Sequence, residues 1–221
     1  MMHVDLRLYA LVDPERAGGR DLAELASMLA RGGATLVQLR DKVGSTQAMV
    51  ETARAMRQRL APLGVPLLIN DRADVAFAAG ADGVHLGQDD MAVADARRLL
   101  GRAAIIGLSI KTVAQAEGAP IDLIDYAGVG GVFATSSKDN PKPPIGPAGL
   151  ARVADALRRR VPGFALCGIA GIDATNAAEV IAAGADGVAV ISALSLRGDP
   201  QAAARALRGI VDAALARRER R

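Results

Sequence analysis

The sequence is poor in aromatic residues, in cysteine and in long apolar runs. Its 221 residues include no Trp, two Tyr and three Phe, although 51% are hydrophobic, so the core must be built from aliphatic side chains. The scarcity of aromatic rings disfavours a surface that stacks single-stranded nucleic acid. No apolar run approaches the roughly 20 residues that span a bilayer, and the first residues show no signal-peptide cleavage site.

The single cysteine, Cys167, excludes an internal disulfide framework. It favours a reducing, cytoplasmic location. The formal net charge is only +3, and part of the excess lies in the final stretch ARRERR. We expect this short basic tail to be a solvated helix end, because no zinc-finger spacing or basic heptad accompanies it. Neither a nucleic-acid partner nor a membrane partner is therefore expected.

Short β-prone runs alternate with Ala- and Arg-rich segments of helical period along the chain. The expected strands are residues 6–12, 34–39, 65–69, 83–86, 103–108, 121–127, 164–167 and 187–192. The expected helices include residues 21–32, 46–64, 91–101, 147–160, 176–184 and 200–218, and another begins near Ala73. Strands that alternate with helices predict βαβ units and a parallel sheet.

Eight strand–helix units fit either a closed (β/α)₈ barrel or an open doubly wound sheet. An open dinucleotide-binding sheet would carry GxGxxG after its first strand, and neither that pattern nor a GxxxxGK[ST] loop is present. The sequence therefore predicts a single α/β domain over residues 1–221, a (β/α)₈ TIM barrel whose barrel spans about residues 6–218. No motif decides the oligomeric state, so a homo-oligomer stays open.

Barrel topology sorts the acidic residues, because active sites of such barrels lie at the carboxyl ends of the strands. Asp82 and Asp186 precede their strands, in GADG, and are expected at the opposite, stabilising end. Asp71 follows the third expected strand, and Asp90 follows the fourth. Carboxylates at neighbouring strand ends suit Mg²⁺, which uses one or two carboxylates plus substrate phosphates.

Two alternatives to this metal pair remain open from spacing alone. Asp71 could instead cap the helix that begins near Ala73, as Asp often does. Asp89 directly precedes Asp90 and competes with it for the same role.

Basic and hydroxyl side chains also follow the expected strands. Small residues after the seventh and eighth strands would let a phosphate approach backbone N–H groups. Together with the carboxylate pair, the basic, hydroxyl and small residues predict a site for a metal-bound diphosphate and a second phosphate at the carboxyl ends of the strands. The contributing residues are Arg40, Lys42, Ser109, Thr135, Ser136, Ser137, Lys138, Gly168 and Ser192.

Two residue types that often act in catalysis are expected to have structural roles here. His85 lies inside the expected strand 83–86, where a hydrogen-bonded core histidine is favoured over a base. Cys167 ends a strand, and only His3 and His85 could pair with it, so a packing role is favoured over a nucleophile.

The ordered series QLRDK, INDRADVA, GADGVHLGQDD, GLS, TSSK and VIS resembles thiamine-phosphate synthase over nearly the whole chain, from about Leu6. INDRADVA together with GVHLGQDD is the most specific part. The resemblance implies a (β/α)₈ transferase that joins 4-amino-2-methyl-5-hydroxymethylpyrimidine diphosphate to 4-methyl-5-(2-phosphoethyl)thiazole. The products would be thiamine phosphate and diphosphate, and the cofactor would be Mg²⁺.

The same resemblance implies roles for individual positions. Asp71 and Asp90 would bind Mg²⁺, which chooses Asp90 over Asp89. The implied catalytic residues are Arg40, Lys42, Ser109 and Lys138. The implied substrate-binding set is Gln38, Leu39, Arg40, Asp41, Lys42, Asn70, Ser109, Thr135, Ser136, Ser137, Lys138, Gly168, Ile191 and Ser192. Within it, Gln38, Arg40, Lys42, Asn70, Ser109 and Lys138 would hold the pyrimidine diphosphate. Thr135 and Ser137, with backbone donors of Gly168, Ile191 and Ser192, would hold the thiazole phosphate.

Two motifs depart from the family pattern. GGVFAT stands where GPVFPT is usual, so two prolines are missing. CGIAGI stands where GGI is usual after the seventh strand, which we interpret as Cys167 in place of one glycine.

The implied chemistry needs charge neutralisation and positioning rather than a general base. Diphosphate can leave first, and the thiazole nitrogen then attacks through a lone pair with no proton to remove. The alternatives are a thiazole tautomerase of the same fold, which would need a base, and a regulatory protein that binds phosphate ligands without catalysis.

Overall fold

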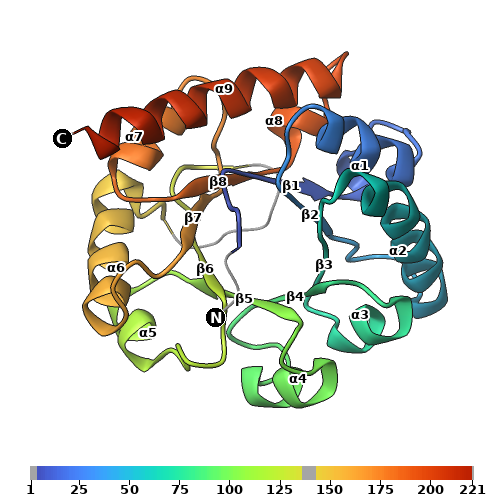
Figure 1. The fold of residues 1–221 in the computed structure, drawn as a ribbon, viewed down its shortest axis with the longest axis horizontal. Helices are drawn as coiled ribbons and strands as arrows, with labels where there is room; N and C mark the ends of the chain where they lie inside the picture. The colour runs from blue at the N-terminus through green and yellow to red at the C-terminus, as the bar shows by residue number, and fades with distance from the viewer. Residues whose placement is uncertain (1–3, 136–142, 221) are drawn as a thin grey trace.

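The computed structural model describes residues 4–135 and 143–220, which form one closed barrel of parallel strands in the order β1 to β8 (Figure 1). The strands are β1 (Leu8–Val12), β2 (Leu36–Leu39), β3 (Leu67–Asn70), β4 (Gly83–Leu86), β5 (Ile105–Ile110), β6 (Tyr126–Gly130), β7 (Leu166–Ile169) and β8 (Gly187–Val190). β8 pairs with β1, where Ala189 lies opposite Tyr9. This closure confirms the predicted (β/α)₈ TIM barrel and excludes the open sheet.

Helices follow the strands and surround the barrel (Figure 1). They are α1 (Leu22–Arg31), α2 (Thr46–Leu60), α3 (Ala73–Ala79), α4 (Val93–Leu100), α5 (Val113–Gly118), α6 (Gly146–Arg160), α7 (Ala177–Ala182), α8 (Ser192–Ser195) and α9 (Pro200–Glu219), with 3₁₀ turns η1 (Pro14–Arg16) and η2 (Ala61–Leu63). α9 packs against both α1 and α7 and so closes the outer ring. Within the described ranges, no helix combines the length and apolar character needed to cross a membrane.

The structure shifts a few of the predicted elements. The sixth strand, expected from residue 121, begins at Tyr126, because residues 119–123 form turns in which Leu123 N–H donates to the Pro120 carbonyl at 2.9 Å. The last strand ends at Val190, and Ser192 begins the short helix α8. The range of helix α5 was not given in advance, because its six residues are too few to display a helical period.

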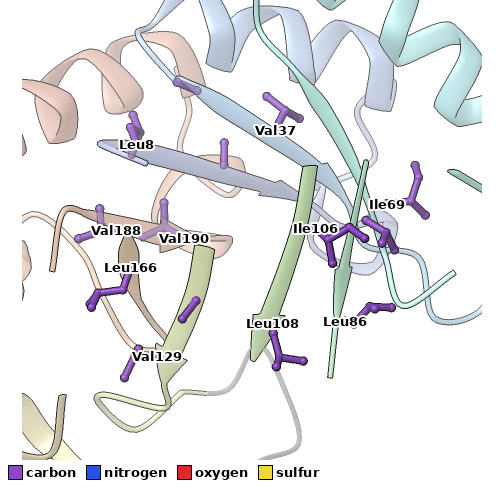
Figure 2. Close-up of a cluster of buried hydrophobic side chains, with 14 of the residues drawn as sticks. Leu8, Val37, Ile69, Leu86, Ile106, Leu108, Val129, Leu166, Val188 and Val190 are labelled. Atoms are coloured by element: carbon purple, nitrogen blue, oxygen red, sulfur yellow. The ribbon is translucent and has the colours of Figure 1, made fainter. Parts of the chain in front are cut away.

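Side chains alternate between the two faces of the barrel wall, as they must along a strand. One set, which includes Leu8, Val37 and Val129, belongs to the large apolar cluster between strands and helices, and Figure 2 shows these side chains on the outer side of the wall. The other set, which includes Tyr9 and Tyr126, fills the interior of the barrel. This alternation decides which strand residues can reach a site inside the barrel.

At the amino ends of the strands, a polar side chain repeatedly accepts a hydrogen bond from the backbone of the neighbouring strand, and we call this bond a clip. The side chains of Thr35, Asp82, Asp125 and Asp186 each accept a hydrogen bond from a backbone N–H near the start of the preceding strand. The donors are Leu8, Leu67, Ile106 and Leu166, at distances of 3.2, 2.8, 2.9 and 3.1 Å. The clip therefore recurs immediately before β2, β4, β6 and β8. Asp82 and Asp186 lie at the stabilising end of the barrel, as predicted.

Candidate active site

A cavity of about 420 Å³ opens at the carboxyl ends of the strands. This volume lies within the range of small-molecule sites. The cavity extends from Tyr9 and His85 inside the barrel to Ile172 and Ala193 in the segments after β7 and β8. The predicted site residues that line it are Gln38, Arg40, Asn70, Ser109, Thr135, Ile191 and Ser192.

Two glycines inside the wall make room for the ring side chains under the cavity. A Cβ on Gly107 would lie 2.2 Å from Tyr126 Cζ, and a Cβ on Gly128 would lie 2.9 Å from His85 Cε1. Real carbon atoms do not approach this closely, so a side chain at either position would displace a ring.

Those rings belong to a chain of hydrogen bonds that forms the cavity floor. Gln38 Nε2 donates to Tyr9 Oη, and Tyr126 Oη also donates to Tyr9 Oη, at 2.9 Å. His85 Nδ1 lies 2.8 Å from Tyr126 Oη, and His85 Nε2 lies 2.9 Å from Ser109 Oγ. Both ring nitrogens of His85 are thus engaged, which agrees with its expected structural role. Burial raises the pKa of both tyrosines, so both stay neutral.

Cys167 lies inside the barrel wall and is fully buried. Burial, with a smaller contribution from the charge of Asp186, raises the pKa of its thiol to about 12. The thiolate required of a nucleophile is therefore disfavoured at neutral pH. This agrees with the packing role that the sequence analysis favours.

Asp71 follows β3 with a left-handed backbone, at φ 62°. Such a conformation is costly for a residue with a Cβ and is found most often at functional sites. The Asp71 N–H donates to the His85 carbonyl at 2.8 Å, and its carboxylate accepts from Lys42 Nζ. The N-cap position, directly before α3, is occupied by Arg72, and no side chain makes a capping hydrogen bond there. The alternative in which Asp71 caps this helix is therefore wrong.

Asp90, rather than Asp89, is the second carboxylate that interacts with Asp71. Its Oδ2 accepts from the Gly87 N–H at 2.7 Å. Burial raises the pKa of Asp90, and the neighbouring Asp71 raises it further. Burial also acts to raise the pKa of Asp71, but hydrogen bonds with Lys42 and Asp90 outweigh it and leave that pKa below its usual value. The two carboxylates thus share a site that favours one bound proton or another positive charge.

The chemistry of this donor pair fits Mg²⁺. It offers two hard oxygen ligands, and Mg²⁺ commonly completes its shell with water and substrate phosphate. Among the described residues, no cluster of three or more His, Cys, Asp or Glu side chains could hold a metal ion. A cation at Asp71 and Asp90 would therefore need further ligands other than described His, Cys, Asp or Glu side chains.

Arg40 is fixed at the rim of the cavity. Its guanidinium pairs with Asp13, whose side chain is only 2% exposed. The backbone N–H of Arg40 donates to the Val12 carbonyl at 2.8 Å. Asp13 also accepts from the Glu15 N–H at 2.9 Å. The arginine is thus held in one orientation by a buried partner.

Two predicted substrate residues next to Arg40 do not reach the cavity. Leu39 belongs to the apolar cluster outside the barrel wall, because it alternates with the inward-facing Gln38. The Asp41 carboxylate accepts from the N–H groups of Val43 and Gly44, at 2.9 and 2.7 Å, within its own loop. Their side chains serve packing and loop shape.

Gly168 also faces away from the cavity. A Cβ there would lie 2.4 Å from Val180 Cγ1 of α7, so the missing side chain makes room for a helix. After β7 the cavity is lined by Ala170 and Gly171, at φ 80° and 66°, and by Ile172 and Asp173. Gly171 therefore borders the cavity, while the backbone-donor role implied for Gly168 stays a prediction.

The same geometry revises the motif assignment. The segment that directly follows β7 is Ala170–Gly171–Ile172, so GGI corresponds to AGI. Ala170, and not Cys167, then stands where the family pattern has a glycine.

Replacement of Ala170 with glycine is expected to raise the free energy of unfolding by up to about 1 kcal/mol. Glycine removes the strain of a Cβ at positive φ, and this gain outweighs the larger conformational entropy that glycine loses on folding. Urea unfolding monitored by circular dichroism measures this change. Ala174→Gly, at an exposed turn position without positive φ, is the matched control and should lower stability. Equal losses of unfolding free energy in the two variants would contradict the expectation that the backbone of Ala170 is strained.

Three further predicted residues, Ser136, Ser137 and Lys138, lie outside the described residues. Their roles remain predictions from the family resemblance.

The cavity also includes charged residues that the sequence analysis did not single out. Asp173, after β7, and Arg197, after α8, both line it. Each stands in a loop without a distinctive motif, so only its distance from the strand ends could have drawn attention to it.

Together, the fold and the cavity define a (β/α)₈-barrel protein with a small-molecule site at the carboxyl ends of its strands. Residues 8–194 match the family model described as thiamine monophosphate synthase. The chain is 51% identical to the thiamine-phosphate synthase of Agrobacterium fabrum, over 99% of this chain and 100% of that protein. It is 49% identical to the enzyme of the same name from Xanthobacter autotrophicus, over 95% of this chain and 97% of that protein.

A solved structure agrees with these matches. The thiamine phosphate pyrophosphorylase from Pyrococcus furiosus superposes with a TM-score of 0.83 at 33% identity, and the match covers 96% of this chain and 98% of that one. The chain therefore belongs to the thiamine-phosphate synthase family, as the sequence motifs had indicated.

Proposed function

We propose that this protein is a Mg²⁺-dependent thiamine-phosphate synthase. It condenses 4-amino-2-methyl-5-hydroxymethylpyrimidine diphosphate with 4-methyl-5-(2-phosphoethyl)thiazole to give thiamine phosphate and diphosphate. The observation that carries the proposal is the interaction of Asp71 with Lys42 and Asp90, directly after Asn70, which lines the cavity of about 420 Å³. A family member with this arrangement has the charges that a diphosphate leaving group requires.

Asp71 and Asp90 would hold the magnesium ion, which when bound would neutralise negative charge on the departing diphosphate. Lys42 bonds Asp71 in the free protein and is only half-exposed, so it can exchange that contact for a phosphate oxygen. Arg40, anchored by Asp13, offers its remaining N–H donors from a fixed position.

The floor of the cavity supports recognition of an aminopyrimidine. Gln38 Nε2 is used by Tyr9, while Gln38 Oε1 is buried and has no partner among the described protein groups. An exocyclic amino group is the type of donor that would satisfy this oxygen, since an unsatisfied buried acceptor is costly. Asn70 and Ser109, also at the cavity wall, would complete the polar contacts.

The reaction would proceed by departure of diphosphate before attack by the thiazole nitrogen. This order needs positioning of two substrates and charge neutralisation, but no proton abstraction. The state of the candidate bases fits that requirement: both His85 nitrogens are hydrogen-bonded, and burial raises the pKa of Cys167. A tautomerase, by contrast, would need a base.

The decisive experiment mixes both substrates with Mg²⁺ and follows diphosphate release and thiamine phosphate formation. We expect release that requires the thiazole phosphate and stops when a chelator removes the metal. Isomerisation of a carboxylated thiazole phosphate would support the tautomerase instead. Binding of both substrates without turnover would support the regulatory protein.

A further inference from the structure

The charged residues that line the cavity are unevenly placed. They are Arg40 after β2, Asp173 after β7 and Arg197 after α8. Arg40 is already paired with the buried Asp13. Arg197 is thus the cation that lines the β7–β8 side of the described cavity, where the proposed function places the phosphate ester of the thiazole.

The backbone of Arg197 is held by hydrogen bonds from a residue that is distant in the sequence. Arg20, just before α1, donates through Nη1 to the Ser195 carbonyl at 3.0 Å and through Nη2 to the Arg197 carbonyl at 2.9 Å. Arg20 Nη1 also reaches the Ala17 carbonyl at 3.3 Å. These bonds span the loop after β1 and the turn after α8, so the Cα atom of Arg197 has a defined place at the rim.

The side chain of Arg197 is held much less firmly than its backbone. It is exposed, and its Nε donates to the Ala193 carbonyl at 3.4 Å, the long end of hydrogen-bond geometry. Hydrogen bonds from Thr175 N–H and Oγ1 to Asp173 Oδ1, at 2.8 and 2.6 Å, lower the pKa of Asp173. The positive charge of Arg197 makes a smaller contribution in the same direction. The guanidinium can therefore turn to an incoming anion at little cost.

The surrounding wall admits an anion beside this side chain. Gly171 lines the cavity, and a Cβ there would lie 2.3 Å from the Ala134 carbonyl oxygen, so this glycine lets the segments after β6 and β7 pack closely at the cavity wall. Thr135 and Ser192 line the same region and carry hydroxyl groups. Hydroxyl donors supply hydrogen bonds, but a phosphate dianion also calls for a positive charge, and guanidinium groups bind phosphate in a bidentate manner.

We propose that Arg197 binds the phosphate ester of the thiazole substrate and sets the preference for the phosphorylated thiazole over its alcohol. The inference rests on the proposed function for the identity of that substrate. The chemistry it requires is only a phosphate monoester at the β7–β8 side of the cavity.

Steady-state kinetics of Arg197→Gln test the inference. We expect KM for the thiazole phosphate to rise about 10- to 100-fold, the loss of one charge-assisted contact, with kcat within about threefold of wild type. The ratio of kcat/KM for thiazole phosphate to that for the thiazole alcohol should fall by the same factor. Arg197→Lys should restore part of the loss. Arg205→Gln, which removes an equal charge from an exposed position of α9, is the matched control and should leave KM unchanged.

A binding measurement separates this inference from the proposed function. Saturating Mg²⁺ and diphosphate first occupy the other phosphate site, and inorganic phosphate is then titrated while thermal unfolding is followed. Wild type and Arg205→Gln should be stabilised by phosphate, and Arg197→Gln should not be.

Each outcome has a defined meaning. An unchanged KM in Arg197→Gln, a fall in kcat alone, or the absence of phosphate stabilisation in wild type overturns the role of Arg197. If wild type makes no thiamine phosphate but phosphate stabilises it only when Arg197 is present, the proposed function fails and the anion site stands.

Discussion

Asp71→Ala is expected to lower kcat/KM by about 10²- to 10³-fold, because it removes one of the two carboxylates proposed to hold Mg²⁺ near the leaving diphosphate. The left-handed backbone at φ 62° and the bond to Lys42 place this carboxylate beside Asp90. Initial rates of diphosphate release at several Mg²⁺ concentrations measure the effect. The apparent Mg²⁺ affinity should fall together with the rate.

Asp82→Ala is the matched control, since it removes a carboxylate from the same βαβ unit at the other end of the barrel. Asp82 Oδ2 accepts from the Leu67 N–H at 2.8 Å, and its loss should cost about 1–3 kcal/mol of unfolding free energy. The kcat/KM of the folded variant should stay near wild type. If Asp82→Ala abolished turnover while Asp71→Ala did not, the assignment of the two barrel ends would be wrong.

Lys42→Ala is expected to lower kcat/KM by about 10- to 100-fold, because the lysine would contact a phosphate oxygen of the leaving group. Lys42→Arg keeps the charge and should recover part of the activity, although its geometry differs. Full activity in Lys42→Ala would remove this residue from the proposed site.

The pH dependence of the same variant provides a second measurement. Burial acts to raise the pKa of Asp71, and the hydrogen bond from Lys42 is the largest influence that lowers it. Without Lys42 the pKa of Asp71 rises, so the ionised form that could bind Mg²⁺ is lost at a higher pH as the solution is acidified. The acid limb of the kcat/KM profile should therefore move to higher pH in Lys42→Ala, but not in Lys42→Arg.

Much of the fold and part of the site follow from position along the strands. The alternation of apolar runs and helical segments predicted every strand of the barrel, and only the bounds shifted. The same topology separated Asp82 from Asp71, because one precedes a strand and the other follows one. Position after a strand also predicted Ser109, and motif resemblance added Gln38 and Asn70; all three line the cavity.

Leu39 and Gly168, two predicted residues within strands, face away from the cavity for one physical reason. Successive side chains in a strand point to opposite faces, so a contiguous motif such as QLRDK cannot send all its members inward. Gln38 faces the interior while Leu39 packs against the helices. Gly168 likewise faces α7, whereas Gly171, beyond the end of β7, borders the cavity.

The sequence by itself determined the barrel, the end at which chemistry is expected and the family to which the chain belongs, because these depend on element order and local motif. Only the tertiary structure decided that Asp71 is bonded by Lys42, that Tyr126 supports Tyr9 and His85, and that Arg197 lines the cavity. These relations join residues from different strands and loops. They depend on side-chain direction and on barrel closure, which no local pattern encodes.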